Sequence, residues 1–300
     1  MAVEPQVRAA FETLRPLDLF STLAPIGFGP TLRIEGADAW HATRTPDGPA
    51  TIHLRQAGGT VEVECWGPGA GWAAANAPSL CGEHDDATGF QPKHRLIADL
   101  HRRNPGLRLP RTQAVFESLV LAVLEQKVTT IEAKAAYRAL VGSLGEPAPG
   151  PVRLRVPPSP QVLARTPYWT FHRFGVERRR AAVIVEAARS AKRLEETTTM
   201  DLAAAHRRLE AFAGVGPWTA AKVALVALGD PDAVEVGDYH LPHAVGYALE
   251  GTPRSTDARM LELLDPYRGH RARVIRLLHV AGISAPRFGP HRPLRDMANN

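Results

Sequence analysis

The 300-residue sequence contains only two cysteines, Cys65 and Cys81. Two thiols cannot build a disulfide framework, and they are too few for a four-cysteine zinc site or an iron–sulfur cluster. The sequence also lacks any run of eighteen apolar residues, and its first residues, MAVEPQVRAAFETLRP, contain no apolar signal region. We therefore expect a soluble, intracellular (cytoplasmic) protein without a membrane partner.

The charge balance is only mildly basic, with 36 Lys and Arg against 31 Asp and Glu, a net charge of +5. Such a balance is compatible with a polyanionic partner but does not require one. The basic residues concentrate near the C-terminus, where the ordinary interpretation of each single arginine is a solvated helix face. These arginines are Arg268, Arg271, Arg273 and Arg276 in an expected helix, and Arg287, Arg292 and Arg295 after it.

The fold class predicted from the pattern is α+β. Apolar residues alternate with polar ones in three short stretches of the first ninety residues, which is typical of half-buried strands. These stretches are Leu32 and Ile34; Ile52 and Leu54; and Val61, Val63 and Cys65. The segment from Gln56 to Gly59 has the composition of a hairpin turn. We expect a small antiparallel-sheet domain over residues 1–90.

The pattern then becomes helical, with expected helices over residues 92–103, from Thr112, over 176–195 and from Thr256. Thr129 and Glu132 form a capping-box pattern at the start of another helix. The proline-dense stretch 146–160 is interpreted as a surface connection between helices. The expected organisation is therefore an all-helical core over residues 91–285, followed by a basic tail over 286–300.

The most informative stretch is LEAFAGVGPWTAAKVALVALGDPDAVEVGDYHLP, residues 209–242. Two helical patterns flank the turn Gly214-Val215-Gly216-Pro217, where the glycines allow close approach and Pro217 suits the first turn of a helix. The N–H groups at such a helix start can bind a phosphate oxygen. A single carboxylate, Asp238, follows about twenty residues later, before a further expected helix that begins near Tyr239.

This combination resembles the helix-hairpin-helix plus Gly/Pro-Asp signature of base-excision DNA glycosylases. Within that superfamily, G-V-G-P-W-T-A is most similar to the bacterial 3-methyladenine DNA glycosylase II (AlkA) branch. The resemblance implies a monofunctional enzyme of base excision repair. It would act as a monomer on damaged double-stranded DNA and hydrolyse the N-glycosidic bond of flipped-out alkylated purines such as 3-methyladenine and 7-methylguanine.

By resemblance, Asp238 is the catalytic carboxylate, and the base pocket contains Trp218, Lys222, Tyr239 and Tyr267. Relatives that also cut the DNA backbone carry a nucleophilic lysine where this chain has Trp218, which favours a monofunctional glycosylase. The chain departs from the branch at Lys222, where the pattern has an aromatic residue. A lysine facing the pocket would repel a cationic base.

A second segment, Leu124-Glu125-Gln126-Lys127-Val128-Thr129, resembles the family turn that enters the minor groove and fills the gap left by the extruded base. Gln126 matches the glutamine of that turn, whereas Lys127 replaces an apolar wedge, which fits between bases more easily than a charge does. The DNA-binding residues implied by the resemblance are Gln126, Lys127, Gly214, Val215, Gly216 and Thr219.

The resemblance implies no required cofactor. It implies an optional structural Na⁺ or K⁺ at the hairpin, bound by the backbone carbonyls of Glu210, Phe212 and Val215. The iron–sulfur cluster of some relatives is excluded here by the cysteine count. His240 and His243 lie close together in the sequence, but no motif supplies a third zinc ligand, so we interpret them as structural.

Two alternatives remain open from the sequence. One is a glycosylase for an oxidised base such as 8-oxoguanine, with lyase activity through Lys222. The other is a non-catalytic protein that binds DNA structures through the hairpin, as the departures at Lys127 and Lys222 would allow. Both alternatives predict salt-sensitive DNA binding, so binding by itself does not separate them from the alkylpurine glycosylase.

Overall fold

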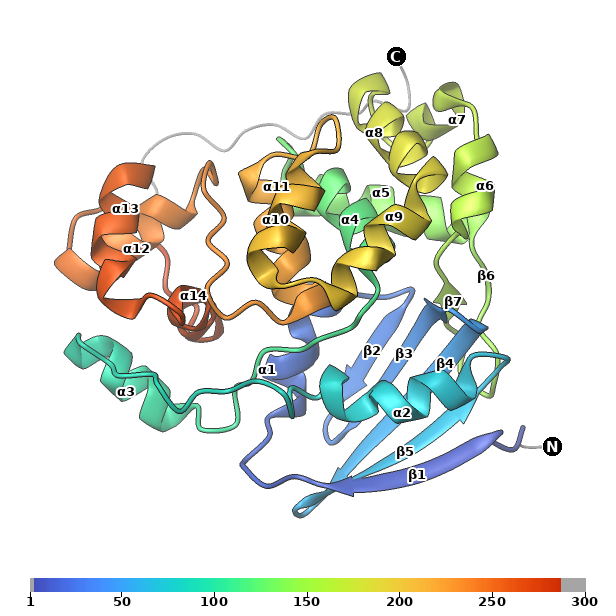
Figure 1. Cartoon of the computed structure of the whole chain (residues 1–300), viewed down its shortest axis with the longest axis horizontal. Coiled ribbons are helices and arrows are strands. Elements are labelled where there is room, and N and C mark those ends of the chain that lie inside the picture. Colours follow the sequence, from blue (N-terminus) through green and yellow to red (C-terminus); the bar gives the residue numbers. More distant parts are fainter. Residues whose placement is uncertain (1–2, 287–300) are drawn as a thin grey trace.

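The computed structural model describes residues 3–286, in which an antiparallel sheet lies below a stack of helices (Figure 1). The α+β fold class predicted from the sequence is confirmed. Within residues 3–286, no helix is long and apolar enough to cross a membrane. The tail arginines Arg287, Arg292 and Arg295 lie outside the described residues.

The sheet has five antiparallel strands in the order β1-β5-β4-β3-β2. The strands are β1 (Val7–Glu12), β2 (Leu32–Glu35), β3 (Asp38–Thr45), β4 (Gly48–Ala57) and β5 (Thr60–Trp66). The predicted hairpin is confirmed, with Ala57 paired to Thr60 and Gly58 in the left-handed region at φ +60°. The sequence did not indicate strands β1 and β3. Residues 8–10 of β1 are all exposed because β1 is an edge strand, and β3 buries the polar side chains of His41 and Thr43, so neither strand shows the alternation of apolar and polar residues.

The N-terminal helices cover the sheet and join it to the rest of the chain. They are α1 (Leu19–Leu23) and α2 (Ala70–Leu80), and the alanine face of α2 lies against β4 and β5 (Figure 1). The apolar cluster under α2 also contains Ala221, Leu225 and Ala272 from much later in the chain. The sheet and the helices therefore share a core, and the boundary expected at residue 90 stays a prediction.

The proline-dense stretch 146–160 is more than a surface connection. It forms a short ladder between β6 (Glu146–Pro147) and β7 (Arg155–Val156), and its apolar residues pack on Ala42 of β3. Val156 is fully buried, and the N–H of Arg155 donates to the carbonyl of Pro30. The prediction that this stretch is only a surface connection was wrong. It was based on the many prolines, but three alternating apolar residues, Val152, Leu154 and Val156, are buried against the sheet.

The central helices pack around one apolar cluster. They are α4 (Val115–Leu124), α5 (Thr130–Leu144), α6 (Pro160–Arg165), α7 (Tyr168–His172), α8 (Arg178–Arg189), α9 (Ala191–Glu195), α10 (Leu202–Glu210) and α11 (Pro217–Val223). The predicted capping box is confirmed: the Thr129 hydroxyl accepts from the N–H of Glu132, and the Glu132 carboxylate accepts from the N–H of Thr129. This cap fixes the point where the chain leaves the turn at Gln126 and Lys127.

A second helical group forms the C-terminal side of the molecule. It consists of α12 (Leu241–Glu250), α13 (Asp257–Leu264) and α14 (Arg271–Val280), with α3 (Arg95–Arg103) packed against α14. In Figure 1 these helices lie to the left of the central helices. We call this group the C-terminal lobe. The segment 229–240 connects it to the π-helical turn η3 (Ala224–Leu228), which continues α11, so this segment carries Asp238 across the junction.

The arginines of α14 do not form the solvated face expected from the sequence. Arg273 and Arg276 are buried, with 3% and 8% of their surface exposed. Arg273 forms a bidentate pair with Asp85, and Arg276 donates to the carbonyl of Ser21 at 2.8 Å. The spacing of these arginines along the helix was visible in the sequence, but their partners lie roughly two hundred residues away in the chain. These two guanidinium groups therefore bind partners inside the protein and do not form a basic surface.

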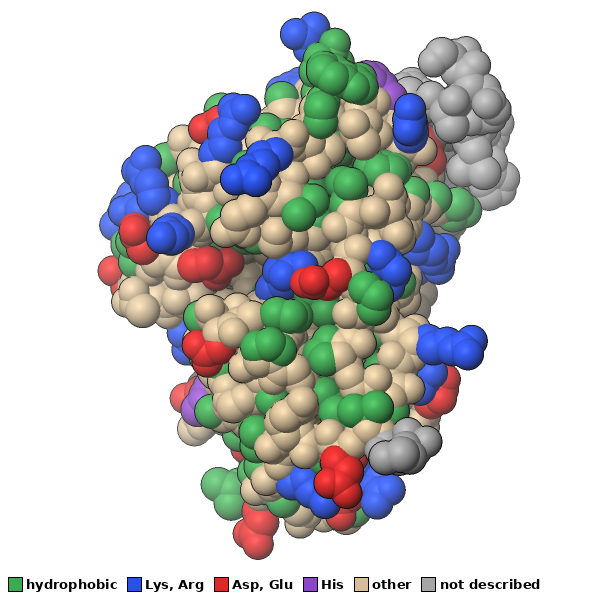
Figure 2. Space-filling view, turned by 90° about the vertical axis from the view of Figure 1, so that its right-hand side faces the viewer, with side chains coloured by type: hydrophobic (Ala, Val, Ile, Leu, Met, Phe, Trp, Pro, Cys, Tyr) green, Lys and Arg blue, Asp and Glu red, His purple; other side chains and the backbone are tan. Residues whose placement is uncertain are grey.

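Other charged side chains are distributed without one dominant sign on the side of the molecule seen in Figure 2. There, basic and acidic side chains alternate with hydrophobic and neutral ones across both the helical and the sheet halves. The net charge of +5 is thus not gathered into one patch on that side.

Removing one partner of the buried Arg273–Asp85 pair should destabilise the fold strongly. Substituting Asp85→Asn leaves the buried guanidinium without its counter-charge, so we expect the free energy of unfolding to fall by about 3–5 kcal/mol. Urea denaturation followed by circular dichroism measures this change. The matched control, Asp47→Asn, alters an exposed loop aspartate and should shift the midpoint little. Equal midpoints for the two variants would contradict a stabilising role of the pair.

Candidate active site

The helix-hairpin-helix turn has the geometry predicted from its glycines and proline. Gly214 adopts φ +86°, and a Cβ atom there would approach Cγ2 of Val183 on α8 to 2.3 Å. Pro217 is the first residue of α11, with Gly216 as its N-cap. A Cβ on Gly216 would meet nothing within 4 Å. Gly214 is therefore required by the fold itself, whereas the absence of a side chain at Gly216 leaves open space in front of α11.

Gln126 connects the turn after α4 to this hairpin. Its side-chain amide donates to the carbonyl of Gly214 at 3.0 Å and to the hydroxyl of Thr219 at 2.9 Å. Thr219 is only 2% exposed, so its side chain holds Gln126 and is not available as the DNA contact expected from the sequence. Next to Gln126, Lys127 is exposed and adopts φ +56°, a conformation uncommon for a residue with a side chain. The two predicted DNA-binding segments therefore lie together.

Asp238 receives three hydrogen bonds. One carboxylate oxygen accepts from the indole N–H of Trp218 at 3.0 Å, and the other accepts from the N–H groups of His240 and Leu241 at 2.7 and 2.8 Å. Burial acts to raise the pKa of Asp238, but these three donors, together with the Lys222 charge, hold it below its ordinary value. Asp238 thus stays ionised while it accepts from the N-cap residue His240 and from Leu241, the first residue of α12, which begins two residues later than the sequence suggested.

Lys222 lies one helical turn after Trp218 and is paired with Glu125. Its ammonium nitrogen is 2.5 Å from Oε2 of Glu125 and 5.1 Å from the centre of the Trp218 ring. Burial would lower the pKa of Lys222, yet the carboxylates of Glu235, Glu125 and Asp238 raise it above its ordinary value. Lys222 is therefore a protonated, paired ammonium at neutral pH.

Sequence reasoning missed Glu125 and Glu235. Glu235 faces Lys222, and its pKa is raised, chiefly by burial and further by Asp238 and Glu125, against the opposing effects of Lys222 and Arg276. A signal for Glu125 was present, because the glutamate directly precedes Gln126 in the quoted turn and the chain has an unexpected lysine at position 222. An unexplained buried charge generally requires a partner of opposite sign.

The two predicted pocket tyrosines differ in their surroundings. Tyr239 is 78% exposed and packs edge-on against His240 and His243. Tyr267 is 2% exposed, and its hydroxyl accepts from the N–H groups of Lys93 and His94. Its surroundings are those of a core residue of the C-terminal lobe.

The histidines near Asp238 have structural partners. Nδ1 of His243 accepts from the N–H of Ser255 at 3.0 Å. Among residues 3–286, no three His, Cys, Asp or Glu side chains are grouped closely enough to hold a metal ion.

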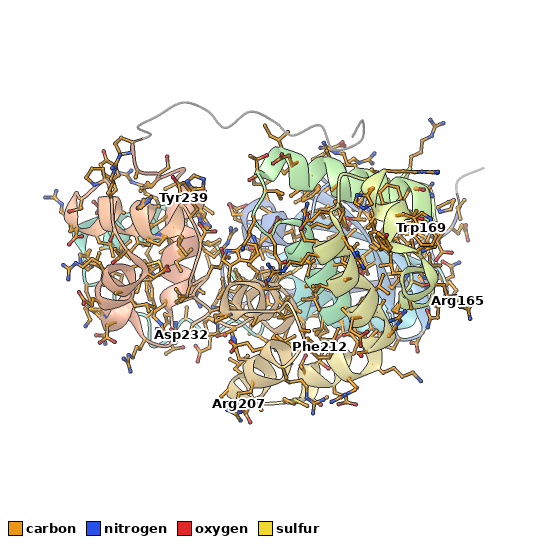
Figure 3. All side chains as sticks on the ribbon, turned by 90° about the horizontal axis from the view of Figure 1, so that it is seen from above. Arg165, Trp169, Arg207, Phe212, Asp232 and Tyr239 are labelled. Carbon is orange, nitrogen blue, oxygen red and sulfur yellow. The ribbon has the colours of Figure 1, made fainter. Side chains whose placement is uncertain are left out.

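Viewed from above, Tyr239 of the segment before α12 and Phe212 of the hairpin lie on either side of the junction between the helical groups, while Trp169 lies at the far end (Figure 3). A cavity of about 470 Å³ lies beside this junction, lined by Pro217 and Val236 together with His206, Asp230 and Arg271, among others. None of Trp218, Lys222, Tyr239 or Tyr267 lines it. Asp238 also lies outside this cavity.

Solved structures of DNA glycosylases share this architecture. A 3-methyladenine DNA-glycosylase from Archaeoglobus fulgidus has a TM-score of 0.74 at 18% identity, covering 91% of this chain and 98% of its own. An 8-oxoguanine glycosylase/lyase from Clostridium acetobutylicum, in complex with DNA, has a TM-score of 0.71 at 13% identity, covering 94% and 97%. At these identities the likeness shows that the chain shares the fold of these two proteins.

Two proteins with similar sequences are named as AlkA or as a 3-methyladenine glycosylase. A probable bifunctional transcriptional activator/DNA repair enzyme AlkA of Mycobacterium tuberculosis is 33% identical over 161 residues, 52% of this chain and 31% of the relative. DNA-3-methyladenine glycosylase 2 of Escherichia coli is 29% identical over 188 residues, 61% of this chain and 63% of the relative. The chain thus matches less than two thirds of either relative's length, and no protein-family model matches it. The predicted resemblance to the AlkA-like branch of the superfamily is confirmed.

The Trp218 hydrogen bond should control the titration of Asp238. Substituting Trp218→Phe keeps an aromatic ring but removes the indole N–H, so we expect the pKa of Asp238 to rise, because the charged form loses a donor. Carbon-13 NMR of labelled aspartate, with the Asp238 signal assigned through Asp238→Asn, measures the titration. Trp169→Phe, an exposed tryptophan on α7, should leave it unchanged. The hydrogen bond would be unimportant if both variants titrate like the wild type.

Proposed function

We propose that this protein is a monofunctional DNA glycosylase, which hydrolyses the N-glycosidic bond of alkylated purines extruded from double-stranded DNA. The observation that carries the proposal is Asp238, a carboxylate that accepts from Trp218 and two backbone donors next to a helix-hairpin-helix turn. The AlkA-like relatives support the alkylpurine class among the possible substrates.

The DNA backbone would lie along the hairpin and the turn after α4. The N–H groups of Gly214 and Gly216 have no hydrogen-bond partner among the described residues, and the space in front of Gly216 allows close approach of a phosphate. Lys127 is exposed beside Gln126, where it would enter the gap left by the base or bind a phosphate. Extrusion of a base costs a few kcal/mol, and these contacts would offset that cost.

The reaction requires stabilisation of positive charge on the sugar. As the bond between C1′ and the purine nitrogen breaks, its electron pair leaves with the base, and the ionised Asp238 stabilises the cationic sugar. Water then attacks C1′ and loses a proton, and the carboxylate can orient this water. The face of Trp218 offers cation–π attraction of about 0.5–2 kcal/mol to a positively charged purine.

The lyase alternative is disfavoured by the state of Lys222. A Schiff base requires an unprotonated amine, whereas the pKa of Lys222 is raised by Glu235, Glu125 and Asp238. The likeness to 8-oxoguanine enzymes concerns the fold and does not specify a substrate. We therefore retain hydrolysis without strand cleavage as the proposed reaction.

We also propose that the hairpin carbonyls bind a Na⁺ or K⁺ ion. Glu210 is the last residue of α10, so its carbonyl is one of those without an intrahelical partner. The carbonyl of Phe212 accepts from the N–H of Val215 at 3.0 Å and has a second lone pair available. Val215 would supply the third carbonyl. Such an ion would neutralise part of the phosphate charge at the hairpin.

Replacing Na⁺ and K⁺ by tetramethylammonium at constant ionic strength should therefore weaken DNA binding, because the large organic cation does not fit between the carbonyls. Fluorescence anisotropy of a labelled duplex measures the change. The Asp238→Asn variant should respond as the wild type does, since the hairpin is untouched. An affinity that is independent of the cation would contradict the proposed ion.

The decisive test of function is single-turnover release of methylated purines from methylated duplex DNA. Asp238→Asn should lower the rate by about 10²–10³-fold, because the amide cannot neutralise the charge that develops in the transition state. DNA affinity, measured at several salt concentrations, should change little and should fall with rising salt in both proteins. The control is Asp265→Asn, an exposed aspartate in the same lobe, which should keep the wild-type rate.

The outcomes separate the open alternatives. A wild-type protein that binds DNA but releases no methylated purine would refute the alkylpurine assignment and direct the test to oxidised and deaminated bases. Release that is unaffected by Asp238→Asn would remove Asp238 as the catalytic carboxylate. Binding without release of any base would favour the non-catalytic DNA-structure binder.

A further inference from the structure

The lysine at position 222 raises a physical problem for the proposed substrate. Its ammonium lies 5.1 Å from the centre of the Trp218 ring, the aromatic surface on which an alkylated purine would be attracted. Two positive charges near the same ring repel each other, more strongly where water is partly excluded. Lys222 by itself would therefore select against the charged bases that leave most easily.

The structure provides a compensating charge. Oε2 of Glu125 lies 2.5 Å from the Lys222 nitrogen, and both side chains are partly buried. Glu125 is the C-cap residue of α4, one residue before Gln126, so the Gln126 hydrogen bonds to the hairpin also fix the position of Glu125. The field of a close ion pair decays with distance much faster than that of an isolated charge.

Other charged groups lie near Lys222. Glu235 and Asp238 face it from the segment before α12, and Arg276 lies beyond Glu235 on α14. With Lys222 paired to Glu125, the carboxylate of Asp238 is left as the ionised group nearest to Trp218. A cationic purine would then meet the negative charge of Asp238 without an opposing ammonium charge, but only while Glu125 neutralises the lysine.

We propose that Glu125 is a specificity-determining residue, whose carboxylate neutralises Lys222 and so allows the site to accept purines that carry a positive charge. This inference rests on the proposed glycosylase function. It assigns Glu125 and Lys222 to substrate selection by charge, whereas Asp238 acts on the sugar. A merely structural ion pair would affect all substrates equally.

The test compares two duplexes, one with a single 7-methylguanine, which is cationic, and one with hypoxanthine, which is neutral. Glu125→Gln leaves the Lys222 charge uncompensated, so release of 7-methylguanine should slow by about tenfold more than release of hypoxanthine. Adding Lys222→Met removes the uncompensated charge and should restore 7-methylguanine release to within about threefold of the wild type. Glu186→Gln, an exposed glutamate on α8, is the matched control and should match the wild type on both duplexes.

Equal slowing on both duplexes, or no recovery in the double variant, would overturn the proposal. If the wild type releases hypoxanthine too slowly to compare, the Lys222 titration described below decides whether Glu125 compensates the lysine charge. Recovery in the double variant is also expected of a pair that only holds the fold together, because removing both charges leaves neither uncompensated, so the difference between the two duplexes is what identifies substrate selection.

A separate measurement keeps this inference distinguishable from the proposed function. Carbon-13 NMR of labelled lysine gives the pKa of Lys222, which should lie above its ordinary value in the wild type and fall in Glu125→Gln. If the wild type releases neither base, the proposed function fails, and this titration still tests the pair. An unchanged Lys222 titration in Glu125→Gln would overturn the charge compensation whatever the enzyme releases.

Discussion

Charged side chains that leave water need partners, and several such groups lie at the junction between the hairpin and the C-terminal lobe. Glu125, Lys222, Glu235 and Asp238 come from three separate parts of the chain and are partly buried together. Removing one partner from such a group leaves another charge uncompensated, which is costly in a medium of low dielectric constant. The mutual placement of α4, α11 and the segment before α12 is therefore tied to the charge balance of the site.

The same constraint explains how the sheet and the C-terminal lobe are joined. Arg273 and Arg276 of α14 are buried against Asp85 and the carbonyl of Ser21, so the last helix is fixed to the N-terminal part of the chain. The position of α14 in turn supports α12, whose first turn is capped by Asp238. A rigid carboxylate is an advantage for stabilising a developing charge, because no reorganisation is needed during the reaction.

The two lysines that depart from the AlkA-like pattern have different surroundings. Lys127 is exposed on a left-handed turn and remains available to a partner, whereas Lys222 is engaged by Glu125. The sequence alone therefore does not show whether a lysine that departs from the family pattern is free or paired. The consequence of such a lysine depends on whether the fold supplies a counter-charge nearby.

The sequence by itself determined the features that depend on local chemistry. These features arise from residues close together in the chain, where backbone conformation and short-range hydrogen bonds decide the structure. They are the hairpin glycine and proline, the Thr129 capping box, the β4–β5 turn and the hydrogen bonds of Asp238 at the start of α12.

The tertiary structure decided the features that depend on partners distant in the chain. Only the fold brings Glu125 to Lys222, Gln126 to Gly214 and Asp85 to Arg273, and only the fold buries Thr219 and Tyr267. Side-chain charge and polarity are visible in a sequence, but whether water or another part of the chain satisfies them is settled by packing.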